Sequence, residues 1–305
     1  MVKPRVLFVG TGFFAATILE ALFDTSTLVG AVTQPPRPQG KNKERLDNPV
    51  AVVAKEKNVP LLTPDKIGTS FEVLEALTPD VLVVADYGQI IPERILLLPP
   101  HGALNLHPSL LPRHRGATPI ESAILEGDDI TGVTLMVMDS KMDHGPVVAV
   151  IEHKLSGNET VLELEAVLAS KAAALLTSTL PNYLEGTVTP HAQEHSKATF
   201  CKMLTREKGY IDGSTTVLQA LRMYRAYQPW PGIWTTVTVN NKPKRLKLLK
   251  VKEWKDFLPE DTNVLFRNDD KLGLKLADGA LIIEEAQLEG KKVQPAKDLI
   301  NGLRV

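Results

Sequence analysis

The stretch Val6-Leu-Phe-Val-Gly-Thr-Gly12 decides the fold class of this chain. A continuous apolar run that ends in a glycine turn is typical of a buried strand leading into a helix. Apolar residues at helical spacing follow over residues 14–23, and a second apolar run covers residues 28–33. This β-α-β order predicts an α/β fold with a Rossmann-like, doubly wound and mostly parallel sheet.

The same glycines also fit a dinucleotide-binding pattern. Gly10-Thr-Gly-Phe-Phe-Ala15 matches G-x-G-x-x-A, which normally works with an acidic residue at the end of the second strand. Here that strand ends in Thr33-Gln34-Pro35, so no acid is present to bind a ribose. The missing acid disfavours an NAD or flavin enzyme, and a tight strand-to-helix turn explains the glycines.

A second stretch concentrates functional residue types: Gly102-Ala-Leu-Asn-Leu-His-Pro-Ser-Leu-Leu-Pro-Arg-His-Arg-Gly116. Asn105 and His107 stand two residues apart, so an extended backbone points both to one face. Pro108 then ends the strand, because proline cannot continue a central ladder. The apolar loop that follows can line a flat ligand with its backbone; it comprises Ser109, Leu110, Leu111 and Pro112.

Asp143 adds a carboxylate in a loop between two predicted strands, residues 132–138 and 146–151. An amide, an imidazole and a carboxylate suit acyl-type transfer, because two groups stabilise an oxyanion and the third accepts a proton. This chemistry needs neither a metal nor a covalent nucleophile. Each residue alone also has a structural explanation, such as a turn cap or a core histidine. Three of them beside one sheet favour function.

Two further groups are candidates for ligand contacts. Tyr87 and Gly88 follow the predicted strand at residues 80–85, and open α/β sheets bind ligands at the carboxyl ends of strands. A simple turn would also explain them. The Pro-rich loop at residues 34–45 can contact phosphates through Arg37, Lys41, Lys43 and Arg45. A solvated loop explains this composition equally well.

The chain length favours two domains. We predict a catalytic domain at residues 1–188, a polar linker at 189–207, and a C-terminal domain at 208–305. Five short predicted strands in the last part indicate a small OB-like β-barrel: 235–239, 246–251, 263–267, 272–276 and 281–288. His191 and His195 stand at i and i+4 in the linker, but no third ligand lies nearby, so we predict no metal.

Charge is unevenly distributed along the chain. The net charge is -1 overall, yet residues 206–305 hold 18 Lys and Arg against 13 acidic residues. Residues 242–255 alone contain seven basic residues and one Glu, which favours binding to a nucleic-acid backbone. Lysines that protect an edge strand are the alternative.

One cysteine, no signal-peptide pattern and no long apolar run predict a cytoplasmic protein, and we expect a monomer.

The chain resembles the 10-formyltetrahydrofolate-dependent formyltransferases. The core of the resemblance is Asn105-x-His107-Pro-Ser-Leu-Leu-Pro112, then Thr131-Gly-Val-Thr134 and Met138-Asp-x-x-x-Asp143-x-Gly145. Similarity to the branch that acts on initiator methionyl-tRNA rests on the basic C-terminal barrel and three further motifs: Thr33-Gln-Pro-x-Arg-Pro-x-Gly40, Ile211-Asp212 and Pro229-Trp-Pro231. Asp86 departs from the family, which often has a small apolar residue there.

The resemblance implies roles for particular residues. Asn105, His107 and Asp143 would be catalytic. The folate co-substrate would lie against residues 109–112, with Tyr87 and Gly88 near its pterin. The tRNA would be contacted by two sets of basic residues: Arg37, Lys41, Lys43 and Arg45 in the loop, and Arg206, Lys242, Lys244 and Arg245 toward the C-terminus.

Two rival interpretations remain at the level of the sequence. A formyltransferase acting on a sugar-nucleotide amine would share the three catalytic residues, but it would not need the basic segments at 37–45 and 242–255. A non-catalytic RNA-binding protein would not need the intact catalytic set. Replacing His107 by Ala distinguishes a formyltransferase from a non-catalytic RNA-binding protein. The enzyme would lose turnover but keep tRNA binding, whereas the binding protein would lose nothing.

Overall fold

The computed structural model describes residues 3–39, 44–239, 241–255 and 264–300. The chain divides into two compact units. The first comprises Met1–Ala123, Asp129–Ser156 and Glu163–Lys202, and the second comprises Ile124–Asp128, Gly157–Leu162 and Met203–Val305.

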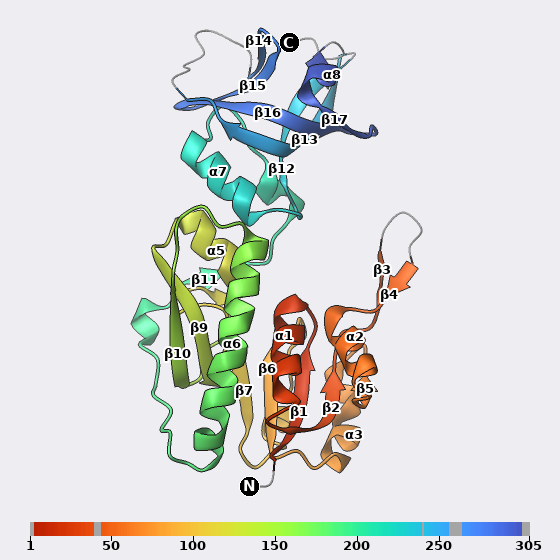
Figure 1. Cartoon of the computed structure of the whole chain (residues 1–305), viewed down its shortest axis with the longest axis vertical. Helices are drawn as coiled ribbons and strands as arrows, with labels where there is room; N and C mark the ends of the chain where they lie inside the picture. Colours follow the sequence, from red (N-terminus) through yellow and green to blue (C-terminus); the bar gives the residue numbers. More distant parts are fainter. Residues whose placement is uncertain (1–2, 40–43, 240, 256–263, 301–305) are drawn as a thin grey trace. The chain divides into compact units, whose positions relative to one another are not determined.

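The first unit is built on a seven-stranded sheet with the order β10-β9-β7-β6-β1-β2-β5 (Figure 1). Five strands are parallel: β1 (Arg5–Gly10), β2 (Thr27–Val32), β5 (Leu61–Leu62), β6 (Val81–Ala85) and β7 (Ala103–His107). Two antiparallel strands complete one edge: β9 (Ile130–Val137) and β10 (Val147–Lys154). The predicted Rossmann-like, mostly parallel sheet is confirmed.

Strand β1 marks the point where the direction of winding changes. It lies between β2 and β6, so the chain first builds outward on one side and then on the other. The connection after β1 leads to β2 on one side, and the connection after β6 leads to β7 on the other side. Doubly wound sheets bind ligands at the carboxyl ends of the strands at such a switch point. Residues 11–12 and 86–88 follow these two strand ends.

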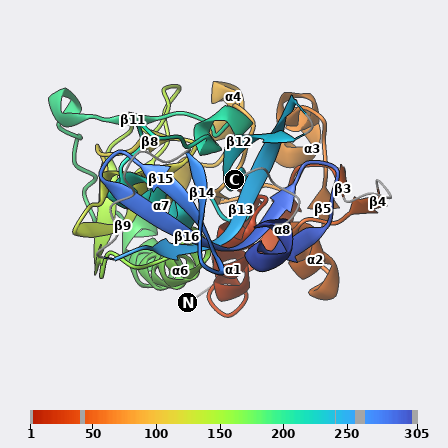
Figure 2. The same ribbon diagram turned by 90° about the horizontal axis from the view of Figure 1, so that it is seen from above.

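Helices cover both faces of this sheet. Figure 2 shows α1 (Phe13–Leu22) and α6 (Val161–Leu184) on one side, and α3 (Phe71–Ala76) and α4 (Glu93–Leu96) on the other. The α3–α4 side buries Leu74, Ile95 and Leu96 against alternate residues of β1 and β6. The remaining helices are η1 (Ile67–Ser70), α2 (Pro49–Glu56), which begins at the N-cap Asn48, and α5 (Pro119–Glu126).

Several short elements have no signal in the sequence. β3 (Arg37–Gln39) and β4 (Glu44–Leu46) form a hairpin where we predict a loop. β8 (Arg115–Gly116) pairs in parallel with β11 (Phe200–Cys201), which lies in the predicted linker together with η2 (His195–Lys197). Two- and three-residue strands of polar or mixed composition show no measurable period, so pattern reasoning does not find them.

The second unit holds a curled antiparallel sheet, a half-barrel that confirms the predicted OB-like domain. Its order is β12-β13-β16-β15-β14, and β17 pairs with β16. The strands are β12 (Ile233–Val239), β13 (Lys242–Glu253), β14 (Leu265–Asn268), β15 (Lys271–Leu276), β16 (Gly279–Leu288) and β17 (Val293–Pro295). Register shifts in β13 near Lys250 bend this long strand. The start of the predicted strand 263–267 lies outside the described residues.

Three helical elements accompany this sheet: η3 (Arg206–Gly209), α7 (Val217–Ala226) and α8 (Ala296–Ile300). α7 begins where the Thr216 side chain accepts a hydrogen bond from the backbone N–H of Gln219, a standard N-cap. Among the described residues of both units, no helix is long and apolar enough to cross a membrane.

Candidate active site

Strand β7 carries two of the three predicted catalytic side chains. It lies between β6 and β9, with Asn105 opposite Val84 and Met136. Asn105 and His107 are 9% and 4% exposed. Because they are two residues apart on one strand, both side chains face the same side of the sheet. An amide and an imidazole are therefore held on a strand that is paired on both sides.

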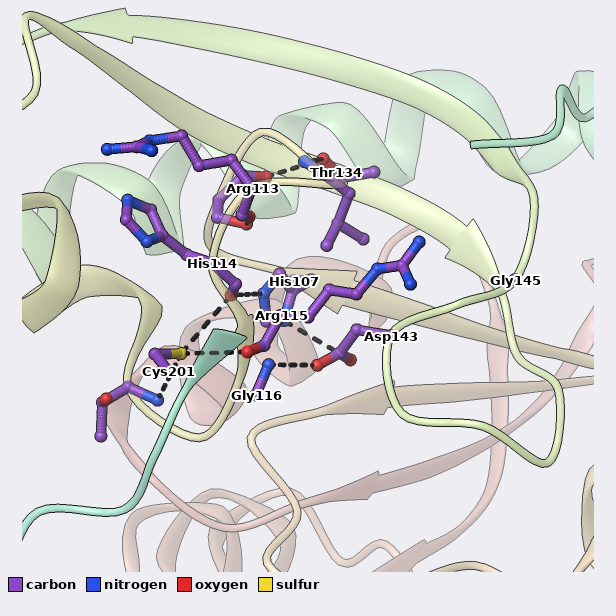
Figure 3. A network of polar contacts seen from close by, with 12 residues as sticks. His107, Arg113, His114, Arg115, Gly116, Thr134, Asp143, Gly145 and Cys201 are labelled. Carbon is purple, nitrogen blue, oxygen red and sulfur yellow. Dashed lines mark hydrogen bonds and ion pairs between the residues drawn. The ribbon is translucent and has the colours of Figure 1, made fainter. Parts of the chain in front are cut away.

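His107 is held by a backbone carbonyl and faces a carboxylate (Figure 3). Its Nε2 lies 2.9 Å from the carbonyl oxygen of His114. A carbonyl only accepts, so Nε2 carries a proton. Its Nδ1 lies 3.6 Å from Oδ1 of Asp143, which is too long for a hydrogen bond but close enough for an ion pair. Nδ1 therefore remains available to a substrate oxygen.

Asp143 uses its two carboxylate oxygens differently. Oδ2 accepts a hydrogen bond of 2.7 Å from the backbone N–H of Gly116, while Oδ1 faces His107. Its φ of +47° is a left-handed conformation that Asp adopts more readily than most residues. Gly145 ends the same loop, and a Cβ there would lie 1.9 Å from the carbonyl oxygen of Val137. The loop backbone is thus shaped to place one carboxylate beside one imidazole.

The loop after β7 has a fixed internal structure. The hydroxyl of Thr134, on β9, donates to the carbonyl of Ser109 at 2.7 Å and accepts from the N–H of Leu111 at 3.1 Å. The Ser109 hydroxyl donates to the carbonyl of Arg113 at 2.6 Å, and Ser109 is fully buried. The Ser109 side chain therefore serves the loop itself. Residues 110–112 stay partly exposed and are the ones that can line a ligand.

Tyr87 lies just beyond β6, at the switch point of the sheet. Its ring packs against the buried cluster on the α3–α4 side. Its hydroxyl is buried and has no hydrogen-bond partner among the described residues, and burial raises the pKa of Tyr87 to about 12. An unpaired buried hydroxyl is a group that a polar ligand atom would satisfy. Gly88 beside it is exposed.

Two carboxyl groups lie at the N-terminal amides of α1. Oδ2 of Asp86 accepts a 3.0 Å hydrogen bond from the N–H of Gly12, where a Cβ would lie 2.1 Å from that oxygen. The N–H of Phe14 lowers the pKa of Glu165, against the effects of burial and of Asp86. A dinucleotide would place its pyrophosphate on such amides. Anions that already hold them are a structural reason, independent of the missing ribose acid, against an NAD enzyme.

Three carboxyl groups share this region and have raised pKa values. Burial raises the pKa of Glu121 to about 6, a value that includes a lowering by its own backbone N–H and smaller increases from the charges of Glu165 and Asp86. Burial also raises the pKa of Asp86 to about 6, against the hydrogen bond from Gly12. The pKa of Glu165 is raised by burial and by Asp86. Asp86 also has a solvent-exposed side, whereas Glu121 is partly buried.

We expect Glu121→Gln to stabilise the protein at pH 8 and to have no effect near pH 4.5. The folded-state pKa of about 6 lies above the ordinary 4.5, so the ionised carboxyl opposes folding above that range and the protonated one does not. For a partly exposed group the gain is on the order of 1 kcal/mol, or about 2–4 °C in melting temperature. Thermal melts at both pH values measure it; a lower melting temperature at pH 8 would contradict the prediction.

The predicted basic residues of the first unit lie on the β3–β4 hairpin. Arg37 and Arg45 are both exposed there, one on each strand. Lys41 and Lys43 lie outside the described residues. The two described arginines therefore stand on a defined antiparallel pair and not on a plain loop.

Two of the four predicted basic residues of the second unit lie beside an indole. The carbonyl of Arg206 accepts a 2.9 Å hydrogen bond from Nε1 of Trp234, and the Arg245 guanidinium stands 6.0 Å from the same ring. Tyr210, 40% exposed, lies 4.8 Å from Trp234 between ring centroids. The other two predicted residues are on β13: Lys242 and Lys244. Aromatic rings beside cations are typical of surfaces that bind single-stranded nucleic acid.

Reasoning from the sequence missed the contribution of residues 191–201 to the site. Gln193 is 7% exposed and contacts the loop that carries Asp143. Its neighbours are polar and mostly exposed, so neither composition nor period distinguishes it. His195 is also engaged, because its Nδ1 accepts from Nη2 of Arg115 at 2.8 Å and its ring stacks on His144 at 4.1 Å. A nitrogen that faces a guanidinium is poorly suited to bind a metal.

The pKa of His195 reflects this environment. Partial desolvation and the nearby charges of His144 and Arg115 lower it from the ordinary value. The lowered pKa favours the neutral ring, whose Nδ1 can accept from Arg115.

The fold and the site together define an enzyme that moves an acyl-like group between two bound molecules, since the side chains can stabilise an oxyanion and accept a proton. The family comparison is more specific. Residues 3–180 match the formyl transferase family and residues 203–304 match the formyl transferase C-terminal domain. The chain belongs to the formyl transferase family.

Similar chains over most or nearly all of the length are named methionyl-tRNA formyltransferase. One from Roseiflexus castenholzii is 40% identical over 306 residues, covering 99% of this chain and 96% of that protein. One from Myxococcus xanthus is 37% identical over 306 residues, with the same coverage. One from Chloroflexus aurantiacus is 44% identical over 234 residues, 76% of each chain.

Solved structures of more distant proteins share the fold. HypX from Aquifex aeolicus in complex with tetrahydrofolic acid has a TM-score of 0.67 at 18% identity, covering 99% of this chain and 48% of HypX. An N-formyltransferase from Helicobacter canadensis, in complex with folinic acid and dTDP-3-aminofucose, has a TM-score of 0.66 at 16% identity, covering 93% and 99%. At these identities the likeness concerns the fold alone.

Proposed function

We propose that this protein transfers the formyl group of 10-formyltetrahydrofolate to the methionine amine of initiator methionyl-tRNA. The product would be N-formylmethionyl-tRNA for translation initiation. The observation that carries the proposal is near full-length identity of up to 40% to relatives named methionyl-tRNA formyltransferase. The tetrahydrofolic acid and folinic acid named with the structural neighbours support a folate donor.

The chemistry follows from the three side chains on one side of the sheet. The methionine amine attacks the formyl carbon, and negative charge builds on the formyl oxygen. Nδ1–H of His107 and the amide of Asn105 donate hydrogen bonds to that oxygen. Asp143 accepts the proton that the amine loses, directly or through one water. The bond between the carbon and the folate nitrogen then breaks, and that nitrogen takes up a proton.

The folate would lie between the loop after β7 and the end of β6. Residues 110–112 are partly exposed and their loop is fixed by Thr134, so they offer a preformed wall. The unpaired hydroxyl of Tyr87 is a hydrogen-bonding group suited to a polar ring such as a pterin. The Ser109 hydroxyl, predicted as a folate contact, is already bonded to Arg113.

The tRNA would be held by cations of both units. Arg37 and Arg45 on the exposed hairpin can contact phosphates, Arg245 beside the Trp234 ring adds stacking to charge, and Arg206 and Lys244 supply further cations. The β13 lysines are not equivalent, however. Lys250 and Lys252 both pair with Glu284, at 3.1 and 2.6 Å.

We expect the double change of Lys244 and Arg245 to Ala to weaken tRNA binding several-fold and to lower the salt-dependence slope by about 2. Each cation that contacts a phosphate releases counterions on binding, so losing two contacts flattens the slope. Filter binding at several salt concentrations measures both effects. The matched control is Lys250 and Lys252 changed to Ala, which should leave the slope unchanged because Glu284 already pairs with both. An unchanged salt-dependence slope in the Lys244 and Arg245 variant would mean that these two residues do not contact the tRNA.

We also propose that the enzyme acts as a monomer in the cytoplasm without a metal ion. A single cysteine suits a reducing compartment. Light scattering after size exclusion should give the mass of one chain, and transfer should persist in EDTA. A dimer mass, or activity lost in EDTA and restored by a divalent cation, would correct these points.

A further inference from the structure

The loop that carries Asp143 needs support from outside itself. β9 runs antiparallel to β7 and ends with Val137 opposite Leu104, three residues before His107. The loop at residues 138–146 must therefore return about 10 Å along the sheet to bring its carboxylate to the imidazole. Most of its residues are exposed or only partly buried. Loops with little buried apolar surface open locally at low cost.

A segment from the predicted linker supplies this support. We call His191–Cys201 the strap. At one end the backbone of His191 exchanges two 2.8 Å hydrogen bonds with Val147, directly after the Asp143 loop. At the other end β11 pairs with β8, whose Gly116 donates to Asp143. The strap is thus attached on both sides of the catalytic carboxylate.

Gln193 makes the direct contact between strap and loop. Its Nε2 donates to the carbonyl oxygens of Asp143 at 3.0 Å and Gly145 at 2.7 Å. Its Oε1 accepts from Nε and Nη2 of Arg115, at 3.2 and 2.6 Å. Gln193 and Arg115 are 7% and 3% exposed. Both donors and both acceptor positions of the amide are used, so its orientation is fixed.

We propose that Gln193 is a positioning residue for formyl transfer: by binding the carbonyls of Asp143 and Gly145 it holds the Asp143 carboxylate beside His107. Arg115 anchors Gln193 from the opposite side. This inference rests on the proposed function. Gln193 need not touch either substrate, because it acts on the backbone of the residue that accepts the proton.

The kinetic test compares Gln193→Ala and Gln193→Glu with the wild type. Glu keeps the size and still accepts from Arg115, but it cannot donate to the two carbonyls. We expect both variants to lose about tenfold to a hundredfold in kcat, the scale of a displaced catalytic group, with KM for folate and tRNA changed less than about threefold. The matched control is Glu194→Ala, since Glu194 is exposed and pairs with Lys197 at 2.7 Å. Wild-type kcat in both Gln193 variants would overturn the proposal.

A double-mutant cycle separates positioning from general damage. In the Asp143→Asn background the carboxylate is already absent, so adding Gln193→Ala should lower kcat little further. If the fold-loss in kcat of the double variant equals the product of the two single losses, Gln193 acts independently of Asp143, and the inference is overturned.

Hydrogen exchange tests the same inference on the protein alone, with no substrate present. The Gly116 N–H is bonded to Asp143, while the neighbouring N–H groups of Arg115 and Ala117 are bonded to the strap carbonyls of Thr199 and Cys201. In Gln193→Ala we expect protection of Gly116 to fall about tenfold or more, with the two neighbours unchanged. Equal loss at all three, or no loss, would overturn the proposal. If the wild type fails to formylate methionyl-tRNA, the proposed function fails, while this measurement still decides the role of Gln193.

Discussion

Replacing His107 by Asn is expected to lower kcat for formyl transfer by about a hundredfold or more, the usual scale for a general acid or base. His107 is the one site residue whose nitrogen can donate to the oxyanion as a cation. Nε2 is bonded to the carbonyl of His114, so Nδ1 alone faces the Asp143 carboxylate and the substrate region. An Asn amide reaches the position of Nδ1 but not that of Nε2, so it offers a neutral donor there and gives up the bond to the His114 carbonyl, which also accepts from Cys201 Sγ at 3.5 Å. The variant should therefore fold and fail in turnover.

Two measurements complete the test of His107. Circular dichroism should show an unchanged melting curve, and tRNA affinity should stay within about twofold of the wild type, since surface basic residues supply that binding. Turnover near the wild-type value would remove His107 from the mechanism. Loss of tRNA binding together with turnover would indicate a misfolded variant, and would assign nothing to the imidazole.

Replacing Asp143 by Ala is expected to have an effect of similar size, about a hundredfold in kcat. The change removes the group that we propose accepts the amine proton. It also leaves the N–H of Gly116 without its 2.7 Å partner. This variant therefore combines the loss of a proton acceptor with the loss of a hydrogen bond that holds the loop.

Asp143→Asn separates the two losses. Its side-chain oxygen can still accept from Gly116, but it is neutral and cannot take a proton. If proton transfer dominates, Asn and Ala lose similar turnover. If the hydrogen bond to Gly116 dominates, Asn keeps most of the activity, and the carboxylate would then be structural. Single-turnover kinetics with both variants measure this directly.

The parallel sheet and the catalytic strand follow from local signals in the sequence. β1 and β6 contain continuous apolar runs because both faces of a parallel strand are buried, whereas β7 carries Asn105 and His107 within its apolar run. The two-residue spacing of Asn105 and His107 on a strand places both on one side. These features depend only on neighbours in the sequence, which is why reasoning from the sequence finds them.

Features that depend on distant residues are not predictable in this way. The spacing of Asp143 from the strands does not show that its loop must fold back along β7. Gln193 looks like any other polar residue of a linker, yet it is buried by residues far from it in the sequence. Asp86 departs from the family pattern, and only the structure shows that it binds the N–H of Gly12.

The most direct test of the central claim is formylation of methionyl-tRNA by the purified protein, with 10-formyltetrahydrofolate as donor and EDTA present. Uncharged initiator tRNA, charged elongator tRNA and a dTDP-amino sugar serve as alternative acceptors. We predict transfer to charged initiator tRNA alone. Transfer to the amino sugar with none to the tRNA would contradict the proposed function and would leave the Asn105, His107 and Asp143 chemistry to a sugar-nucleotide formyltransferase.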